Sequence, residues 1–254
     1  MVFKKMMRAL GVGGPSVDTV LDRADTVPGA VLTGQVHIAG GDHEVDIEHV
    51  ALGLVTRVEV ESGDSEYDTT VEFQRALAGG RFRVAAGQNY SLPFQLQIPW
   101  ETPLTAVFGQ QLHGMTLGVR TELSVAKAVD KGDLDGVAVL PLPSQERVLQ
   151  GFGSLGFHFK RADLERGQIR GVRQTLPFYQ EIEFHPPQHM YGRVNEVELT
   201  FVTSPQGMSV VIEADKRGGI FHSGHDAIGR FDVTHEQAEK MDWAAQISNW
   251  IGRF

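Results

Sequence analysis

The tract from Tyr90 to Asp135 constrains the fold of this chain most, because apolar residues alternate with other residues on both sides of a proline-bearing break. The first run places apolar side chains at every second position, at Leu92, Phe94, Leu96 and Ile98. It ends at Pro99 and Pro103, and alternation resumes at Met115, Leu117, Val119, Thr121, Leu123 and Val125. A period of two that stops at proline is typical of a strand leaving a sheet. The tract therefore predicts two strands joined by a long crossover.

Shorter strand-like runs precede this tract and are separated by glycine-rich turns. Turn signals occur at Pro28-Gly29, at residues 40–42 and at Gly79-Gly80. The runs that they separate lie at residues 16–21, 31–38, 46–61, 69–75 and 80–85. Regular strands divided by such turns predict an antiparallel β-sandwich.

The rest of the chain predicts a second β-rich unit and a closing helix. Strand-like runs lie at residues 157–164, 168–174, 180–184, 195–202, 208–216 and 230–233. Thr234 and Gln237 have the spacing of a capping box, which predicts that a helix begins there. The predicted division is residues 1–143 for a first sandwich with a leading helix, 144–155 for a linker, 156–233 for a second sandwich and 234–254 for a C-terminal helix.

Three segments resemble known proteins. Residues 92–99 (Leu-Pro-Phe-Gln-Leu-Gln-Ile-Pro), the crossover and residues 119–125 (Val-Arg-Thr-Glu-Leu-Ser-Val) resemble the amino-terminal domain of arrestin-like proteins. With residues 176–184 and 195–201, the resemblance extends over nearly the whole chain to the bacterial sporulation-control proteins of the stage-zero M family. It implies an all-β fold of two tandem arrestin-like antiparallel β-sandwich domains with short N-terminal and C-terminal helices.

The same resemblance implies a function. It suggests a non-catalytic regulatory or scaffold protein that binds other proteins, needs no cofactor and controls sporulation or cell development. Sheet edges that accept a partner strand and a hinge at residues 141–156 would serve such binding. The resemblance also suggests that charged groups hold the two domains together, and Asp130, Asp133 and Asp135 are the residues expected to form this interdomain network.

Composition excludes several classes of function. The formal net charge is −9, which argues against nucleic-acid binding, since that relies on clustered Lys and Arg. The chain has no cysteine, which removes disulfides and thiolate chemistry and fits the reducing cytoplasm, where we expect the protein. No apolar run is long enough to predict a membrane-spanning helix. The sequence has neither the pattern of a nucleophile elbow nor that of a phosphate-binding loop, so no enzyme is predicted.

Two alternative functions stay open at this level. His222, His225 and Asp226 are the best metal-ligand candidates, and they would suit a metal-binding module or a metal-assisted enzyme. Lys4, Lys5 and Arg8 lie on the polar side of an amphipathic segment, which could make peripheral contact with an anionic membrane as a surface adaptor or pack on the body of the protein.

The predicted C-terminal helix has an apolar side that must be covered. It carries Met241, Ile247, Trp250 and Ile251. These side chains could contact another protein, form a homodimer or dock on the rest of the chain.

Overall fold

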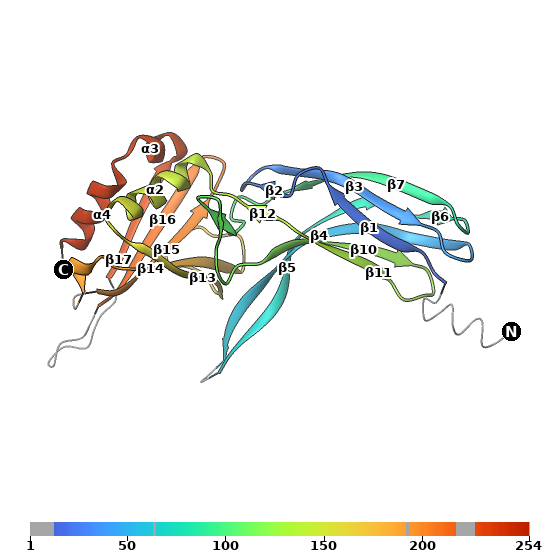
Figure 1. Cartoon of the computed structure of the whole chain (residues 1–254), viewed down its shortest axis with the longest axis horizontal. Helices are drawn as coiled ribbons and strands as arrows, with labels where there is room; N and C mark the ends of the chain where they lie inside the picture. Colours follow the sequence, from blue (N-terminus) through green and yellow to red (C-terminus); the bar gives the residue numbers. More distant parts are fainter. Residues whose placement is uncertain (1–12, 63–64, 192–193, 217–226, 254) are drawn as a thin grey trace.

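The computed structural model describes residues 13–62, 65–191, 194–216 and 227–253, and Figure 1 shows them as two groups of strands arranged along one long axis. The prediction of an all-β fold with short helices is confirmed. The strands of the first group are β1 (Ser16–Leu21), β2 (Asp25–Thr26), β3 (Val31–Ala39), β4 (Val45–Ser62), β5 (Ser65–Gly79), β6 (Phe82–Val84), β7 (Asn89–Gln97), β8 (Ala106–Val107), β9 (Gln110–Gln111), β10 (Leu117–Val125), β11 (Lys131–Gly136) and β12 (Ala138–Val139).

This first half has two layers. One sheet has the order β1-β3-β7, and the other brings β11, β10, β4, β5 and β6 together. Alternation along each strand turns every second side chain inward. The resulting core takes Phe94 and Leu96 from one sheet and Leu52, Leu54 and Val119 from the other, all at most 5% exposed. The crossover predicted between residues 99 and 115 carries only the short strands β8 and β9.

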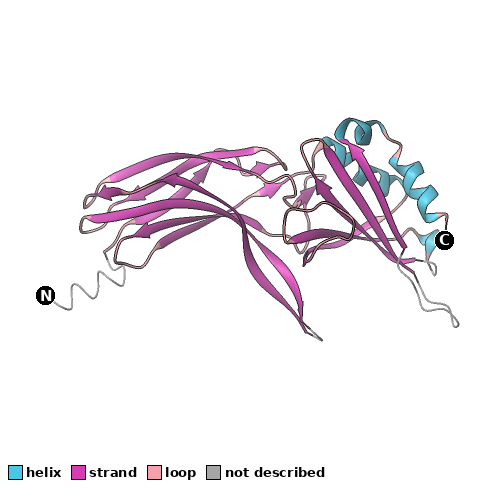
Figure 2. Ribbon diagram, turned by 180° about the vertical axis from the view of Figure 1, so that it is seen from behind, coloured by secondary structure: helices cyan, strands magenta, loops and turns pink. Residues whose placement is uncertain are grey.

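The second half is a five-stranded antiparallel sheet with helices on one face, as Figure 2 shows in magenta and cyan. Its sheet order is β13-β14-β15-β16-β17. The strands are β13 (His158–Arg166), β14 (Phe178–His185), β15 (Val194–Thr203), β16 (Gly207–Lys216) and β17 (Ala227–Thr234), and the helices are α2 (Pro143–Ser154), α3 (His235–Lys240) and α4 (Trp243–Ile251), with a 3-10 turn at Gln188–Met190. The helices therefore form the second layer of this half.

Aromatic contacts attach the helices to the sheet. The Phe152 ring of α2 is completely buried, stacks on Phe184 of β14 at 4.7 Å between ring centroids and meets Phe157 edge-on at 5.2 Å. Trp243 of α4 packs edge-on against Phe231 of β17 at 5.7 Å. The segment predicted as a linker is thus a helix that packs on the second half.

The C-terminal segment contains two helices where the sequence predicted one. The capping box at its start is confirmed, since Thr234 Oγ1 accepts from Gln237 N and Gln237 Oε1 accepts from Thr234 N. The first helix ends at Lys240, and the Asp242 carboxylate caps a second helix by accepting from Ala245 N at 3.0 Å. A second N-cap inside the segment starts a new helix in a new direction. Among the helices of the described ranges, none has the length and apolarity to span a membrane.

A hairpin of unusual length connects the halves. β4 pairs with β10 in the first half, and further along the same strand Glu59 pairs in parallel with Glu165 of β13. Its partner β5 carries Phe73, whose ring meets Phe178 of β14 edge-on at 5.5 Å. The two sheets are therefore joined into one hydrogen-bonded path, and the hairpin projects from the middle of the molecule (Figure 1).

A polar clasp also holds the halves together. The buried Gln180 side chain of β14 donates from Nε2 to the Leu104 carbonyl at 2.7 Å and accepts at Oε1 from Leu104 N at 2.9 Å. Glu101 accepts from the backbone N–H groups of Thr175 and Leu176 at 2.8–2.9 Å. We call the two hydrogen bonds between Gln180 and Leu104 the Gln180 clasp.

Candidate functional site

The face of the second sheet that lies opposite the helices carries a ladder of carboxylates. Side chains alternate between the two faces along a strand, so the residues that flank the helix-facing positions of β14, β15 and β16 share this opposite face. Cross-strand pairing places Glu183 beside Glu198, and Glu198 beside Glu213. One strand away, Asp163 of β13 lies beside Glu181. We call this surface the acidic face and define its central residues as Asp163, Glu181, Glu183, Glu198 and Glu213.

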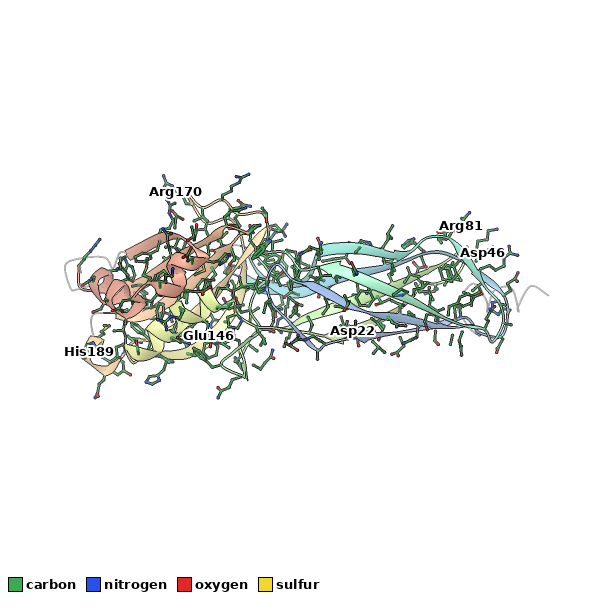
Figure 3. All side chains as sticks on the ribbon, turned by 90° about the horizontal axis from the view of Figure 1, so that it is seen from above. Asp22, Asp46, Arg81, Glu146, Arg170 and His189 are labelled. Carbon is green, nitrogen blue, oxygen red and sulfur yellow. The ribbon has the colours of Figure 1, made fainter. Side chains whose placement is uncertain are left out.

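The acidic face contains a pocket of about 330 Å³. Its floor is formed by strands β14 to β17, and its rim by the loop that follows β13. Figure 3 shows Arg170 of this loop projecting outward from the second half. Ile228 of β17 lines the pocket and is 65% exposed. The residues that line the pocket are Gln168, Ile169, Arg170, Val172, Tyr179, Glu181, Glu198, Thr200, Val211, Glu213, Ile228 and Arg230.

Burial and mutual repulsion shift the pKa values of this face upward. Burial, with a smaller contribution from the Glu198 charge, raises the pKa of Glu181 to about 8. Burial and the neighbouring Glu213 raise the pKa of Glu198 to about 7. Burial also raises the pKa of Tyr179 to about 12. Because an ionised carboxylate loses hydration when it is buried and repels like charges, both glutamates are partly protonated near neutral pH.

Lysine and arginine side chains neutralise one side of the acidic face. The Glu183 side chain is 3% exposed and forms ion pairs with Lys160 Nζ at 2.6 Å and with Arg161 Nε at 2.7 Å. Arg161 also pairs with Asp163 at 3.2 Å. These cations compensate the carboxylates of β13 and the adjacent part of β14.

Three carboxylates at the inner end of the acidic face are close enough to share an ion. Oxygen atoms of Glu59, Asp163 and Glu165 all lie within 4.8 Å of one another. Asp163 already has Arg161 as a counter-charge, and burial is the main cause of its raised pKa. A compensated carboxylate of this kind is a poor ligand for a hard cation. We therefore assign no ion to the cluster.

Buried Ser144 and half-buried His235 form a hydrogen-bonded pair with a structural role. His235 Nε2 lies 2.9 Å from the Ser204 carbonyl, and Nδ1 lies 2.8 Å from Ser144 Oγ. A carbonyl can only accept, so Nε2 carries a proton and donates to the Ser204 carbonyl. Ser144 is 1% exposed, so the pair links α2 and α3 to the β15–β16 turn and offers no reachable nucleophile.

The predicted acidic cluster of the first half does not bring the two halves together. Asp130 accepts from Val125 N at 2.9 Å, and Asp133 accepts from Thr19 N at 2.7 Å. Asp135 lies on the same strand, β11, which pairs with β10, and burial is the main cause of its raised pKa. These contacts lie within the first half, so the interpretation of the three residues as an interdomain network has no support in the described part of the chain.

Other predicted site residues fall into two groups. The first group lies outside the described residues and consists of His222, His225, Asp226, Lys4, Lys5 and Arg8. In the C-terminal segment, Met241 is partly exposed, and the other three predicted contact residues are buried against this chain's own core: Ile247, Trp250 and Ile251. The alternative of docking on the parent chain is therefore the arrangement present, and those three side chains offer no surface to a partner.

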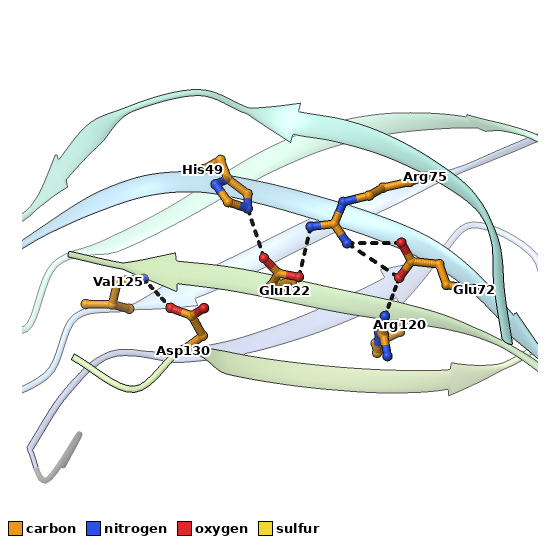
Figure 4. Close-up of polar contacts among 7 residues, drawn as sticks. All are labelled: His49, Glu72, Arg75, Arg120, Glu122, Val125 and Asp130. Atoms are coloured by element: carbon orange, nitrogen blue, oxygen red, sulfur yellow. Dashed lines mark hydrogen bonds and ion pairs between the residues drawn. The ribbon is translucent and has the colours of Figure 1, made fainter. Parts of the chain in front are cut away.

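The first half carries an ionic network on its outer surface, which Figure 4 shows beside Asp130. The Glu122 carboxylate of β10 lies 2.9 Å from His49 Nε2 and 2.8 Å from Arg75 Nη2. Arg75 also contacts Glu72 at 3.2 Å, and Glu72 pairs in turn with Arg120. Hydrogen bonding from Arg75 is the main cause of the lowered pKa of Glu122. The network links β4, β5 and β10 across one sheet.

Replacing Glu122 with glutamine is expected to cost about 1 kcal/mol or less in unfolding free energy at pH 7, because its partners remain partly exposed to water. A lowered folded-state pKa stabilises the protein above the unfolded pKa and loses this effect as pH falls through the folded pKa. Urea unfolding at pH 7 and pH 3 measures the difference. The gap between variant and wild type should close at pH 3, and an equal gap at both pH values would contradict the assignment.

Comparison with known proteins identifies relatives over most of the chain. The family model described as SpoOM protein matches residues 3–218. The sporulation-control protein spo0M of Bacillus subtilis (strain 168) is 32% identical over 216 residues, which cover 85% of this chain and 81% of that protein. The crystal structure of Spo0M, sporulation control protein, from Bacillus subtilis superimposes with a TM-score of 0.81 at 27% identity and covers 94% of this chain and 98% of that chain.

The sequence alone did not predict the acidic face. The glutamates of β14 to β16 stand at alternate positions of three successive strands, which is also the pattern of an ordinary solvated strand face. The alternation in these strands was the available signal. Alternation does not reveal the pairing register of neighbouring strands, and this register places Glu183, Glu198 and Glu213 side by side.

Proposed function

Because the chain belongs to the SpoOM protein family, we propose that it is a non-catalytic cytoplasmic regulator that binds other proteins through the acidic face. The regulated process in this proposal is sporulation or a related step of cell development, as the name of the Bacillus subtilis relative suggests. The observation that carries the proposal is the acidic face with its pocket, on a sheet whose other face is occupied by helices.

The chemistry of the acidic face indicates the kind of partner. Glu181, Glu198 and Glu213 would attract lysine or arginine side chains, and electrostatic complementarity sets the specificity and rate of association. Ile228 adds an exposed apolar contact at the edge of the same pocket. The hydrophobic effect is the dominant favourable term in most protein–protein association. A partner segment with basic and apolar side chains fits both features.

Strand β17 offers a second mode of binding on the same side of the molecule. It ends the sheet order of the second half, beyond β16. A terminal strand has one row of backbone N–H and C=O groups directed away from the sheet, and an extended peptide can pair with that row. A bound strand would lie next to Ile228, so the two modes can combine.

Charge reversal in the pocket is expected to weaken partner binding strongly. We would place a photo-crosslinking amino acid at position 228 in cells of the native host, with position 77 as the matched control because Leu77 is exposed on the first half. Position 228 should capture a segment containing basic residues, and Glu213→Lys should reduce capture at least about tenfold, since it turns a charge attraction into repulsion.

Two outcomes would contradict this proposal. One is capture of the same proteins with equal yield from positions 228 and 77, because the contact would then be unspecific. The other is capture from position 228 that persists in Glu213→Lys, because the acidic face would then contribute nothing to recognition. Urea unfolding of Glu213→Lys checks that the loss of capture does not come from an unfolded second half.

A further inference from the structure

The second sheet has one short ladder, between β14 and β15. Their pairing is recorded over three residues of each strand, Ile182–Phe184 with Val197–Leu199. The neighbouring ladders, β13 with β14 and β15 with β16, run along nearly the whole of their strands. We call the β14–β15 ladder the seam. Because fewer backbone hydrogen bonds close it, the seam is the place where the five strands β13 to β17 separate with the smallest loss of pairing.

Like charges lie directly on the seam. Glu183 of β14 and Glu198 of β15 are cross-strand partners, and Glu198 has Glu213 on its other side. Glu181 lies one pleat away on β14 and is raised in pKa by the Glu198 charge as well as by burial. Like charges directly opposite each other in a sheet are destabilising. The ionisation state of Glu181 and Glu198 therefore acts on the weakest ladder of the sheet.

Every strand near the seam contributes charged or titratable groups to this face. Glu183 has Lys160 and Arg161 as counter-charges. Glu181 and Glu198 carry no such ion pair among the described contacts. The other groups that face them are Glu59 of β4, Asp163 and Glu165 of β13, Tyr179 of β14, Glu196 of β15, Glu213 of β16, Arg230 of β17 and Arg170 of the pocket loop.

The seam is connected to the contact between the two halves through one residue. Beyond the three-residue ladder, Thr200 Oγ1 of β15 donates to the Gln180 carbonyl of β14 at 2.8 Å, and this bond is buried. The side chain of the same Gln180 forms the clasp on Leu104 of the first half. Separation of β14 from β15 would break the Thr200 bond and displace the residue that holds Leu104.

We propose that the seam is a charge-sensitive joint, and that ionisation of Glu181 and Glu198 opens it and releases the Gln180 clasp. Through this joint, the charge on the acidic face controls how freely the two halves move relative to each other. It is a property of the free protein and does not depend on any partner. A failure of this proposal is therefore distinguishable from a failure of the proposed binding function.

The sign of the pH dependence follows from the shifted groups. Their folded-state pKa values lie above the unfolded value of 4.5, so the stabilisation is fully present below that value. It is lost as pH rises through about 7 for Glu198 and about 8 for Glu181. The joint is closed at pH 6 and opens towards pH 8.5.

Amide hydrogen exchange at pH 6 and pH 8.5, corrected for the intrinsic pH dependence of exchange, tests the joint. Protection of residues 182–184 and 197–199 should fall at least about tenfold at the higher pH, because each unit of pKa shift corresponds to a tenfold change in an equilibrium constant. The Leu104 amide, which donates to Gln180, should lose protection in parallel. The double variant Glu181→Gln and Glu198→Gln should keep its protection at both pH values.

The matched control is Glu239→Gln, which removes an exposed carboxylate on helix α3 and should behave as wild type. Unchanged protection of the seam between pH 6 and pH 8.5 in the wild type would overturn the proposal. So would an equal loss in the double variant, because other groups would then be responsible. Loss at the seam without loss at Leu104 would overturn the coupling to the clasp.

Discussion

Phe152→Ala is expected to lower the unfolding free energy of the protein by about 3–5 kcal/mol, the usual cost of removing a fully buried aromatic ring. The ring is completely buried and contacts both Phe184 and Phe157, so its removal leaves a cavity between α2 and the second sheet. Urea unfolding at pH 7, followed by far-ultraviolet circular dichroism, measures the change in midpoint and slope.

Two further variants support the interpretation of that measurement. Phe152→Leu fills part of the cavity and should recover a substantial share of the lost free energy. Phe108→Ala truncates a phenylalanine that is 58% exposed and should cost about 0.5 kcal/mol or less. Equal losses for Phe152→Ala and Phe108→Ala would mean that α2 does not depend on this ring for its place on the sheet.

Gln180→Met is expected to release the two halves from each other. Methionine has nearly the same volume but cannot pair with Leu104, a residue that is 1% exposed and whose backbone would keep an unpaired N–H and C=O group. A buried backbone group without a partner costs about 1–3 kcal/mol. Stability should fall accordingly, and the distance distribution between spin labels at positions 81 and 170 should broaden, since these positions lie at opposite ends of the molecule (Figure 3).

The control for this variant is Gln95→Met, which changes an exposed glutamine of β7 in the same way. It should leave both the stability and the distance distribution as in wild type. A narrow distribution in Gln180→Met would contradict the role of the clasp, since the β4–β5 hairpin and the Phe73–Phe178 contact would then be enough to hold the halves.

Local sequence pattern predicted the regular parts of the fold well. The strand at residues 16–21 has the predicted bounds, and the turn between β15 and β16 is closed by a bond from Ser204 N to the Gly207 carbonyl at 2.8 Å. The capping box at Thr234 is also present. In each case the determinant is local, because alternation, turn residues or cap spacing lie within a few residues of each other.

Prediction failed where a distant or unusual contact decides the structure. Residues 168–174 were predicted as a strand from their alternation, but they form a loop. There the Gln174 side chain donates to the carbonyls of Gly167, Leu176 and Phe178, all at 2.8–3.0 Å. Here a single side chain takes the hydrogen bonds that a neighbouring strand would otherwise make. Such a substitution does not change the alternation of apolar residues along the sequence. The break between α3 and α4 was missed in the same way, although Asp242 is a good N-cap residue.

The candidate site was the least predictable part, because it depends on register. The sequence directed attention to histidines and turn aspartates, whereas the carboxylates with the largest upward pKa shifts, Glu181 and Glu198, are glutamates in regular strands. Glu181 and Glu198 look alike in the sequence and differ from other strand glutamates only through burial and through neighbours on other strands. Neither property can be read from one strand at a time.

The length of β4 has a consequence for how this family can evolve. One continuous strand, Val45–Ser62, is paired with β10 at Thr56 and with β13 at Glu59. Insertion of a single residue between these two positions would reverse the face of every later side chain in the strand, since the period of a strand is two. We therefore expect insertions and deletions among relatives to gather in turns such as residues 126–130 and 204–207. The segment between Thr56 and Glu59 should keep its length among relatives. Because this one strand pairs with both halves, we expect relatives to contain the two halves together.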